Sequence, residues 1–313
     1  MKIAFFWTWE FSRNILKSLT LYQNIEVLLV VSQPDKPVWR NKEVIYTPIK
    51  QLALENKIDL LQPLKLKNNI EVFQKLQYLE LDFIIVVAYW KIIPKDILEI
   101  PKYWCINIHW SLLPKYRWAS PIQECLKSWD KKTWLTIMYM SEWMDEWDLL
   151  SIKEIDVDIV DKTWDIFRKF EDFWPDLLVE TLNWIIDWKI KGTKQDCDCA
   201  TYCKKIEKED WLIDFKNLSR DEIYNRFRAY YVWPWIYTYY NWKKLNLEEV
   251  SILDDDKYDW QVWQVVKLQN KKVWVLAKDS KILIVDKVKL EWKKSIDILS
   301  FINWNKDFLG AIL

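Results

Sequence analysis

The sequence predicts an α/β protein in which a Rossmann-like, open and mostly parallel sheet is followed by a smaller C-terminal β-barrel of the OB type. Up to about residue 187, short apolar runs typical of buried strands alternate with segments of helical spacing. From about residue 206 the pattern changes to short alternating runs at regular spacing, as in small barrels. The chain has 313 residues, of which 51% are hydrophobic, so it can bury two separate cores.

Apolar runs rich in Val, Ile and Leu define the strands expected in the first part of the chain: 2–6, 25–32, 83–88, 105–108, 133–140 and 149–157. Helical spacing, or a proline suited to a first turn, defines the expected helices: 11–21, one opening at Pro48, one opening at Pro94, 121–128, and 161–187 with a break near Trp174 and Pro175. A polar loop at 33–47 carries three basic residues, Lys36, Arg40 and Lys42.

Periodicity is lost at 190–205, which we expect to be a linker. After it we expect a helix at 219–229 and strands at 236–241, 245–252, 261–268, 272–278 and 281–290. The domains are therefore expected at 1–189 and 206–313. The C-terminal part has a small excess of Lys and Arg over Asp and Glu, which permits a nucleic-acid partner without requiring one.

Composition excludes several classes of protein. The 46 basic residues balance 46 acidic ones, which argues against binding through blanket positive charge. No run of 18 or more apolar residues occurs, so we expect no membrane span. The first residues, MKIAFFWTWEF, predict a strand rather than a signal peptide, and five Cys are too few for a disulfide scaffold, so we expect a cytoplasmic protein.

Three of the cysteines, Cys197, Cys199 and Cys203, have the spacing C-x-C-x3-C. A metal clip is one interpretation of this spacing. Since no His lies nearby as a fourth ligand, free thiols without a bound metal are the stronger interpretation.

Two residue counts are abnormal, because the chain has 2 Gly and 24 Trp. An average Gly share of about 7% would give roughly 22 Gly in a chain of this length. The excess of Trp is close to the deficit of Gly, as if most glycines were written as Trp.

The Trp residues also stand where glycine is expected. Asn241-Trp242 lies between two β-rich runs, where Asn-Gly is the strongest hairpin signal. Trp188 ends a long helical pattern, where Gly is the favoured cap, and Trp7 and Trp9 follow a strand, where a Gly turn is expected. Some bacteria read the codon UGA as glycine where other codes read tryptophan, so we interpret this sequence as a translation with the wrong code. The alternative is a tryptophan-rich surface for sugars or membrane interfaces, but such residues would cluster with a single periodicity.

The single His of the chain carries the strongest indication of chemistry. His109 ends an apolar strand, and Asn107 lies two residues before it, so both side chains point to the same face. Polar residues at the carboxyl end of a strand in an open α/β sheet lie in the ligand crevice. A lone His is most often structural, but an amide and an imidazole aimed at one point suit a developing oxyanion.

A carboxylate that orients His109 should come from another segment. The candidate is Asp145, in a turn between a strand and the next apolar run. The alternative for this segment taken alone is an ordinary acidic surface turn. We nevertheless expect Asn107, His109 and Asp145 to meet in one crevice, because both segments end strands of one sheet.

Taken together, these segments resemble the methionyl-tRNA formyltransferase family. With Trp110 and Trp118 read as Gly, Cys105 to Ala119 is similar to the family's central motif, Gly-Cys-Ile-Asn-Ile-His-Gly-Ser-Leu-Leu-Pro-Lys-Tyr-Arg-Gly-Ala, and residues 136–145 resemble the segment that bears its catalytic Asp. Further similarities lie at 5–11, 33–37, 86–94, 200–202, 214–215, 228–230 and 233–234, so the resemblance covers nearly the whole chain. The Asn-x-His and Asp pattern alone is shared by all 10-formyltetrahydrofolate-dependent transferases.

The resemblance implies transfer of a formyl group from 10-formyltetrahydrofolate to the amine of initiator methionyl-tRNA, with no metal, by a monomer. It implies that Asn107 and protonated His109 stabilise the oxyanion and that Asp145 orients His109 and helps to relay the amine proton. It implies a folate site lined by Ser111, Leu112, Leu113, Pro114, Tyr89 and Ile93. It also implies that Arg40 and Lys42 contact the tRNA, for which the alternative is a solvated basic loop.

Three rival classes remain at this point. One is a formyltransferase for a ribonucleotide or an amino sugar, which would lack or replace this C-terminal part. Another is a non-catalytic protein that binds tRNA or single strands through its barrel, and the third is the carbohydrate binder already described. The family has Trp-Pro at 233–234, so Trp233 is a genuine Trp under this interpretation. Indoles at 104, 110, 143 and 147 would instead fill the crevice and strain its turns.

Overall fold

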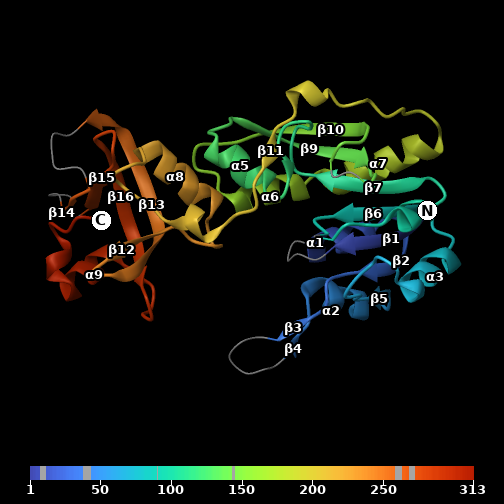
Figure 1. The fold of residues 1–313 in the computed structure, drawn as a ribbon, viewed down its shortest axis with the longest axis horizontal. Coiled ribbons are helices and arrows are strands. Elements are labelled where there is room, and N and C mark those ends of the chain that lie inside the picture. The colour runs from blue at the N-terminus through green and yellow to red at the C-terminus, as the bar shows by residue number, and fades with distance from the viewer. Residues whose placement is uncertain (8–11, 38–43, 90, 143–144, 258–262, 268–271) are drawn as a thin grey trace. The chain divides into compact units, whose positions relative to one another are not determined.

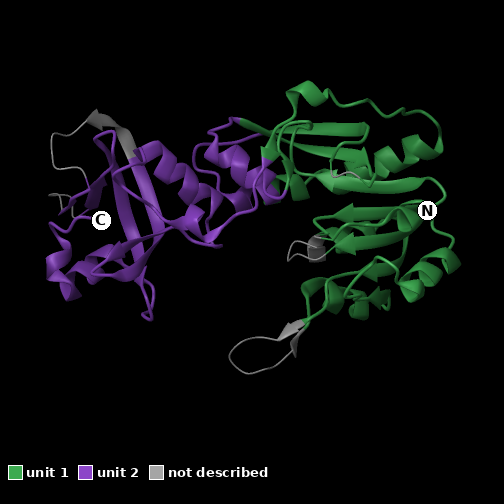
Figure 2. Ribbon diagram, in the orientation of Figure 1, with its two compact units in different colours: residues 1–118, 132–155, 168–202 green, residues 119–131, 156–167, 203–313 purple. Residues whose placement is uncertain are grey.

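The computed structural model describes residues 1–7, 12–37, 44–89, 91–142, 145–257, 263–267 and 272–313 (Figure 1). The chain forms two compact units (Figure 2). Unit 1 comprises Met1–Trp118, Lys132–Ile155 and Arg168–Tyr202. Unit 2 comprises Ala119–Lys131, Asp156–Phe167 and Cys203–Leu313.

Unit 1 is built on a seven-stranded sheet in the order β10-β9-β7-β6-β1-β2-β5. Its strands are β1 (Lys2–Trp7), β2 (Glu26–Val31), β5 (Asp59–Leu61), β6 (Phe83–Val87), β7 (Trp104–His109), β9 (Lys132–Tyr139) and β10 (Leu149–Asp156). From β5 to β7 all neighbours are parallel, and β9 runs antiparallel to β7. The carboxyl ends of the parallel strands therefore share one edge, and β7 brings His109 to it.

Both faces of this sheet are covered. One face packs Ala4, Phe6, Ile84 and Val86 against side chains from α3 (Ile70–Tyr78) and α4 (Lys95–Leu98). Ile3, Phe5, Phe83 and Ile85, which alternate with them, are fully buried as well. Burial on both faces is the reason why these strands read as continuous apolar runs rather than alternating ones.

The remaining helices of the first part of the chain are α1 (Ser12–Leu19), α2 (Pro48–Glu55), α5 (Pro121–Lys127), α6 (Thr163–Glu171) and α7 (Trp174–Ile186). The helix α2 begins at Pro48 behind Thr47, whose side chain accepts a hydrogen bond from the Lys50 amide. The break predicted near Trp174 and Pro175 is the start of α7, and Pro175 lies in its first turn.

The C-terminal part of unit 2 is an antiparallel sheet in the order β12-β13-β16-β15-β14, and β17 also pairs with β16. Its strands are β12 (Tyr237–Tyr240), β13 (Lys243–Lys257), β14 (Val265–Lys267), β15 (Val273–Leu276), β16 (Lys281–Leu290) and β17 (Ile296–Asp297). The helices α8 (Arg220–Ala229) and α9 (Ile298–Trp304) both contact β16. Among the described residues the pairings follow an open path, as in a half-barrel.

The predicted fold class is confirmed, with a mostly parallel sheet first and an antiparallel β module second. The structure adds β5, α3 and α9, which the sequence interpretation left undefined. It also places a two-stranded pair, β3 (Lys36–Pro37) with β4 (Val44–Ile45), in the expected polar loop, and β8 (Arg117–Trp118) with β11 (Tyr202–Cys203) near the expected linker. Short 3-10 helices lie at Cys197–Cys199, Lys208–Trp211 and Lys306–Phe308.

None of the described helices is long and apolar enough to cross a membrane.

Candidate active site

The centre of the candidate site is the end of β7. His109 is the last residue of this strand, and Asn107 precedes it by one full pleat, so both project from the same face. The strand is held on both sides, by β6 in parallel and by β9 in antiparallel register. This pairing fixes the backbone from which the amide and the imidazole project.

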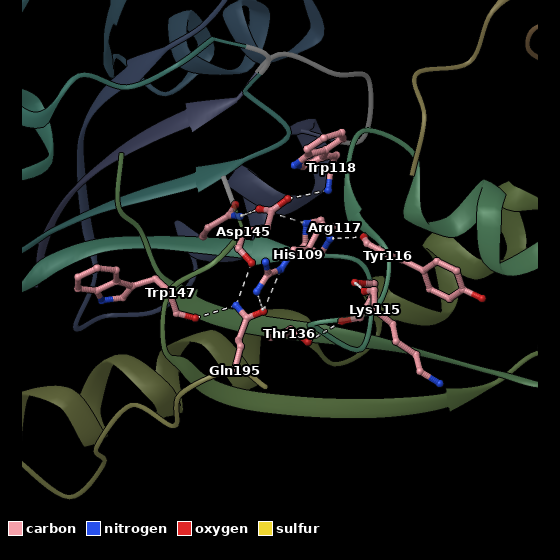
Figure 3. A network of polar contacts seen from close by, with 11 residues as sticks. His109, Lys115, Tyr116, Arg117, Trp118, Thr136, Asp145, Trp147 and Gln195 are labelled. Atoms are coloured by element: carbon pink, nitrogen blue, oxygen red, sulfur yellow. Dashed lines mark hydrogen bonds and ion pairs between the residues drawn. The ribbon is translucent and has the colours of Figure 1, made fainter. Parts of the chain in front are cut away.

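Asp145 reaches the same point from the connection between β9 and β10 (Figure 3). Its Oδ1 atom lies 3.7 Å from His109 Nδ1 and accepts a hydrogen bond from Asn107 Nδ2 at 3.4 Å. The side chains of His109 and Asp145 are 8% and 13% exposed, so their interaction is little screened by water. The three residues named from the sequence therefore meet at one carboxylate oxygen.

The second nitrogen of the His109 ring is also occupied. His109 Nε2 lies 2.9 Å from the carbonyl oxygen of Tyr116. A carbonyl oxygen only accepts, so Nε2 donates in this contact, while Nδ1 faces the Asp145 carboxylate at 3.7 Å, beyond hydrogen-bond distance. The His109 ring is thus held by a backbone carbonyl on one side and faces a carboxylate on the other.

The second oxygen of Asp145 is held by the segment that follows Tyr116. Asp145 Oδ2 accepts a hydrogen bond from the Trp118 backbone N–H at 2.9 Å. A carboxylate with acceptor contacts on both oxygens has a fixed orientation. The cluster combines an amide donor, an imidazole and an oriented carboxylate, a set that can stabilise an oxyanion and move a proton.

The loop after β7 holds four of the six residues expected at a folate site. Ser111 is buried, and its hydroxyl donates to the Lys115 carbonyl oxygen at 2.7 Å, within the same loop. Leu113 is buried against Met138 and Leu149, while Leu112 and Pro114 are half-buried. The loop is therefore held by a hydrogen bond within it and by the packing of Leu113.

The other two expected folate residues, Tyr89 and Ile93, follow β6 and are buried in one apolar cluster of unit 1. The Tyr89 ring packs edge-on against Phe6, with 5.3 Å between ring centroids. Burial raises the pKa of Tyr89 well above its ordinary value. Among the described residues its hydroxyl is buried and has no hydrogen-bond partner.

Arg40 and Lys42, expected to contact tRNA, lie outside the described residues. The three clustered cysteines are free: Cys197 and Cys199 are exposed, and Cys203 is buried. Within the described ranges, no group of three or more His, Cys, Asp or Glu side chains is arranged to hold a metal ion.

Two residues that the sequence interpretation left without a role, Arg117 and Gln195, contact the connection that carries Asp145. Arg117 lies 3.2 Å from Glu146 through Nη1 and Oε1, and Gln195 donates to the Asp145 carbonyl oxygen at 2.9 Å. Arg117 stood within the resemblance at 105–119, but Gln195 lies 50 residues after Asp145, in a segment without periodicity. No local pattern could have indicated that contact.

Indoles also occupy the edge of the sheet where the site lies. Trp7 ends β1 and Trp110 follows β7, and both are buried, with exposed fractions of 1% and 8%. Their ring centroids are 6.4 Å apart, and Trp110 packs on Phe170 at 5.2 Å. The Trp7 indole N–H is buried with no hydrogen-bond partner among the described residues.

Many Trp residues have a backbone conformation that suits glycine. Five of the 24 Trp lie outside the described residues, and seven of the other 19 have a positive φ: Trp118, Trp129, Trp188, Trp235, Trp242, Trp263 and Trp292. Only a few per cent of non-glycine residues have a positive φ, mostly Asn and Asp. Trp188 follows α7 and Trp242 is the second turn residue between β12 and β13, as expected for glycine at both places.

Comparison with known families identifies the class of protein. Residues 1–182 match the formyl transferase family, and residues 205–306 match the formyl transferase C-terminal domain. The chain therefore belongs to the formyl transferases.

Comparison with individual proteins narrows the class. The chain is 38% identical over 314 residues to the methionyl-tRNA formyltransferase of Caldicellulosiruptor saccharolyticus, with 100% of each chain covered. It is 35% identical over 313 residues to that of Clostridium novyi, again with 100% of each covered. The chain belongs to the methionyl-tRNA formyltransferase family.

Solved structures share the fold at low identity. A methionyl-tRNA formyltransferase from Clostridium thermocellum is 18% identical, with a TM-score of 0.56 over 93% of this chain and 99% of that one. HypX from Aquifex aeolicus, crystallised with tetrahydrofolic acid, is 15% identical, with a TM-score of 0.63 over 100% of this chain and 48% of that one. WlaRD, a sugar 3N-formyl transferase, is 15% identical, with a TM-score of 0.62 over 94% of this chain and 99% of that one.

Proposed function

We propose that this protein transfers the formyl group of 10-formyltetrahydrofolate to the α-amine of methionyl-tRNA. The observation that carries the proposal is the meeting of Asn107 and His109 on Asp145 Oδ1 at the end of β7, in a chain of this family. Full coverage of the relatives, including their C-terminal part, favours the tRNA enzyme over a sugar or nucleotide formyltransferase.

The reaction needs a neutral amine, and an α-amino group with a pKa of about 8 supplies a useful neutral fraction at pH 7. The amine nitrogen attacks the formyl carbon, the bond from that carbon to folate N10 breaks, and a proton passes from the amine to N10. Asn107 Nδ2 carries a second hydrogen besides the one that faces Asp145, so it can donate to the oxyanion. Charged His109 stabilises the same oxyanion, and Asp145 orients His109 and relays the amine proton.

The substrates are assigned to surfaces around this centre. Ser111 to Pro114, Tyr89 and Ile93 line the folate site, and among the described residues the buried Tyr89 hydroxyl there has no hydrogen-bond partner. Arg40 and Lys42 bind the tRNA acceptor arm through phosphate contacts. Residues 1–189 form the catalytic domain, 190–205 a linker and 206–313 the tRNA-binding domain of a cytoplasmic monomer.

Most of the Trp residues are proposed to be glycine in the natural protein, encoded by UGA. The positive φ of seven Trp residues supports this assignment. The buried indole N–H groups of Trp7, Trp211 and Trp263 also support it, because they have no hydrogen-bond partner among the described residues. The two glycines that the sequence does contain, Gly192 and Gly310, also lie where glycine is required. Gly310 has φ +86°, and a Cβ on Gly192 would lie 2.5 Å from Asp148 Cβ.

Two measurements test these proposals separately. The nucleotide sequence of the gene, with peptide masses of the protein from its own cells, tests the decoding; UGG codons at the positive-φ positions would refute it. The function is tested with the full chain carrying glycine at each UGA codon, 10-formyltetrahydrofolate, and either methionyl-tRNA or a nucleotide-linked amino sugar. Formylation of the sugar but not of the tRNA would refute the acceptor assignment.

A further inference from the structure

A hydrogen-bonded pair beside the site, Arg117 and Gln195, has no part in the mechanism above. We propose that this pair positions Asp145 by holding the backbone of the turn that bears it. The proposal rests on the proposed function, because it assigns how the catalytic carboxylate of that reaction is oriented.

The amide of Gln195 is bonded on both of its ends (Figure 3). Gln195 Nε2 donates to the carbonyl oxygen of Asp145 at 2.9 Å and to that of Trp147 at 2.7 Å. Gln195 Oε1 accepts from Arg117 Nε at 3.3 Å and from Nη2 at 2.9 Å. The opposite orientation of the amide would point its oxygen at two carbonyls and its nitrogen at a guanidinium, so the bonds allow one orientation.

The Asp145 turn needs such support, because the backbone of Asp145 has a conformation that is uncommon for a residue other than glycine. Asp145 has φ 57°, in the left-handed region that is unfavourable for a residue with a side chain. The two carbonyls that Gln195 engages lie on either side of Glu146, so one amide holds the whole turn. Rotation of this turn would move the Asp145 carboxylate relative to His109 and Asn107.

Arg117 orients the Gln195 amide through its hydrogen bonds, and other contacts hold the Arg117 side chain in place. Its side chain is 1% exposed, and it donates to Tyr202 Oη at 3.4 Å and to Cys197 Sγ at 3.7 Å. Burial alone would lower the pKa of Arg117, but these hydrogen bonds and the charge of Glu146 raise it, so the guanidinium stays charged. A buried charge that loses an acceptor is costly, which makes the pair with Gln195 rigid.

The same stretch of chain contacts Asp145 from the other side. Trp118, the neighbour of Arg117, donates its backbone N–H to Asp145 Oδ2. Arg117 and Gln195 therefore hold the backbone of the turn, while Trp118 holds the carboxylate. A shift of about 1 Å in a catalytic group can reduce turnover about 10²-fold, so loss of the pair should act on the chemical step.

The test measures steady-state formylation by the full chain, with glycine at each UGA codon, for Gln195→Ala and Gln195→Glu. Both remove the donor to the two carbonyls, but Gln195→Glu keeps the volume and the acceptor for Arg117. We expect kcat to fall by about 10- to 100-fold in both, with KM for folate and for tRNA within about two-fold. The matched control is Thr181→Val, which removes a buried hydroxyl bonded to Ser151 Oγ at 2.7 Å in the same unit. It should lower the melting temperature without lowering kcat per folded molecule.

A double-substitution cycle separates positioning from general support. If Gln195 acts through Asp145, Gln195→Ala should have little further effect on kcat once Asp145→Asn is present. Equal losses in both backgrounds, or an unchanged kcat per folded molecule in Gln195→Ala and Gln195→Glu, would overturn the proposal. An unsubstituted chain that does not formylate methionyl-tRNA would instead refute the proposed function, so the two failures are distinguishable.

Discussion

Replacement of Trp242 by glycine should stabilise the C-terminal sheet of unit 2, although it deletes a large side chain. Trp242 is the second residue of the two-residue turn between β12 and β13, and Tyr240 pairs directly with Lys243 across it. Its φ is 63° and that of Asn241 is 48°, the combination that defines the turn favouring Asn-Gly. The indole is 99% exposed, so its removal deletes almost no packing.

The size of the effect follows from two opposing terms. A left-handed conformation costs an L-residue about 1–2 kcal/mol, and glycine does not incur this cost. Glycine loses about 0.5–1 kcal/mol more conformational entropy on folding than alanine does. The net gain is about 1 kcal/mol, and with a urea m-value of about 2 kcal/mol/M the unfolding midpoint should rise by about 0.5 M.

The assay is urea unfolding of the chain in which the other six positive-φ Trp are already glycine. The matched control is Trp304→Gly, since Trp304 is also exposed, at 86%, but ends the helix α9 at a negative φ. Glycine is a poorer helix former than Trp, so this substitution should lower stability by about 0.5 kcal/mol. A loss of stability in Trp242→Gly equal to that in Trp304→Gly would refute the argument from backbone conformation.

Three further predictions concern the site, the tRNA loop and the acid stability of unit 1. His109→Ala should lower kcat by about 10²- to 10³-fold in single-turnover formylation, while fluorescence titration shows folate binding unchanged; near-normal turnover would exclude His109 from the chemistry. Arg40→Ala with Lys42→Ala should weaken methionyl-tRNA binding and reduce its salt slope by roughly 0.7–0.9 for each lost contact, and an equal loss of folate affinity would show that the loop only supports the fold. The pKa of Asp35 is lowered, because hydrogen bonds from Lys50, Gln62 and the Thr47 amide outweigh its burial. Its contribution to stability is thus present above the unfolded pKa of about 3.9 and lost as pH falls through the lower folded value. Urea midpoints of Asp35→Asn should therefore change less below pH 4 than those of the parent, and identical acid limbs would contradict this account.

The sequence was sufficient for those parts of the fold whose signal is local. The central strands β1 and β6 are buried on both faces, so each appears as an apolar run of its own. Pro48 and Pro175 mark the starts of α2 and α7. The strand β5 has only three residues and lies at the edge of the sheet, so its run was too short to stand out. The helix α3 follows an Asn69 cap, a signal that was present but unused.

In the candidate site, too, the residues with a local sequence signal could be predicted and the others could not. Asn107 and His109 could be paired from sequence because strand geometry places residues two apart on one face. The expected meeting with Asp145 is observed, but not for the expected reason: β9 runs antiparallel to β7, so the two strands do not end at one edge, and Asp145 reaches Asn107 and His109 from the connection between β9 and β10. Gln195 could not be found this way, since its contact with the Asp145 turn depends on the path of a segment without periodicity. Such a contact is a property of the tertiary structure alone.

The two buried indoles beside the site connect the decoding with the function. In open α/β sheets, ligands bind beyond the carboxyl ends of the parallel strands, and Trp7 and Trp110 stand at the ends of β1 and β7. Their rings contact each other there and leave the Trp7 N–H buried without a partner, which is a cost that no part of the described fold offsets. Glycine at these two positions would remove both rings from the region in which we propose that the folate binds, and would remove that unsatisfied donor. Glycine in place of Trp would therefore suit the positive φ of the turn positions, and at residues 7 and 110 it would also clear the region proposed for the substrate.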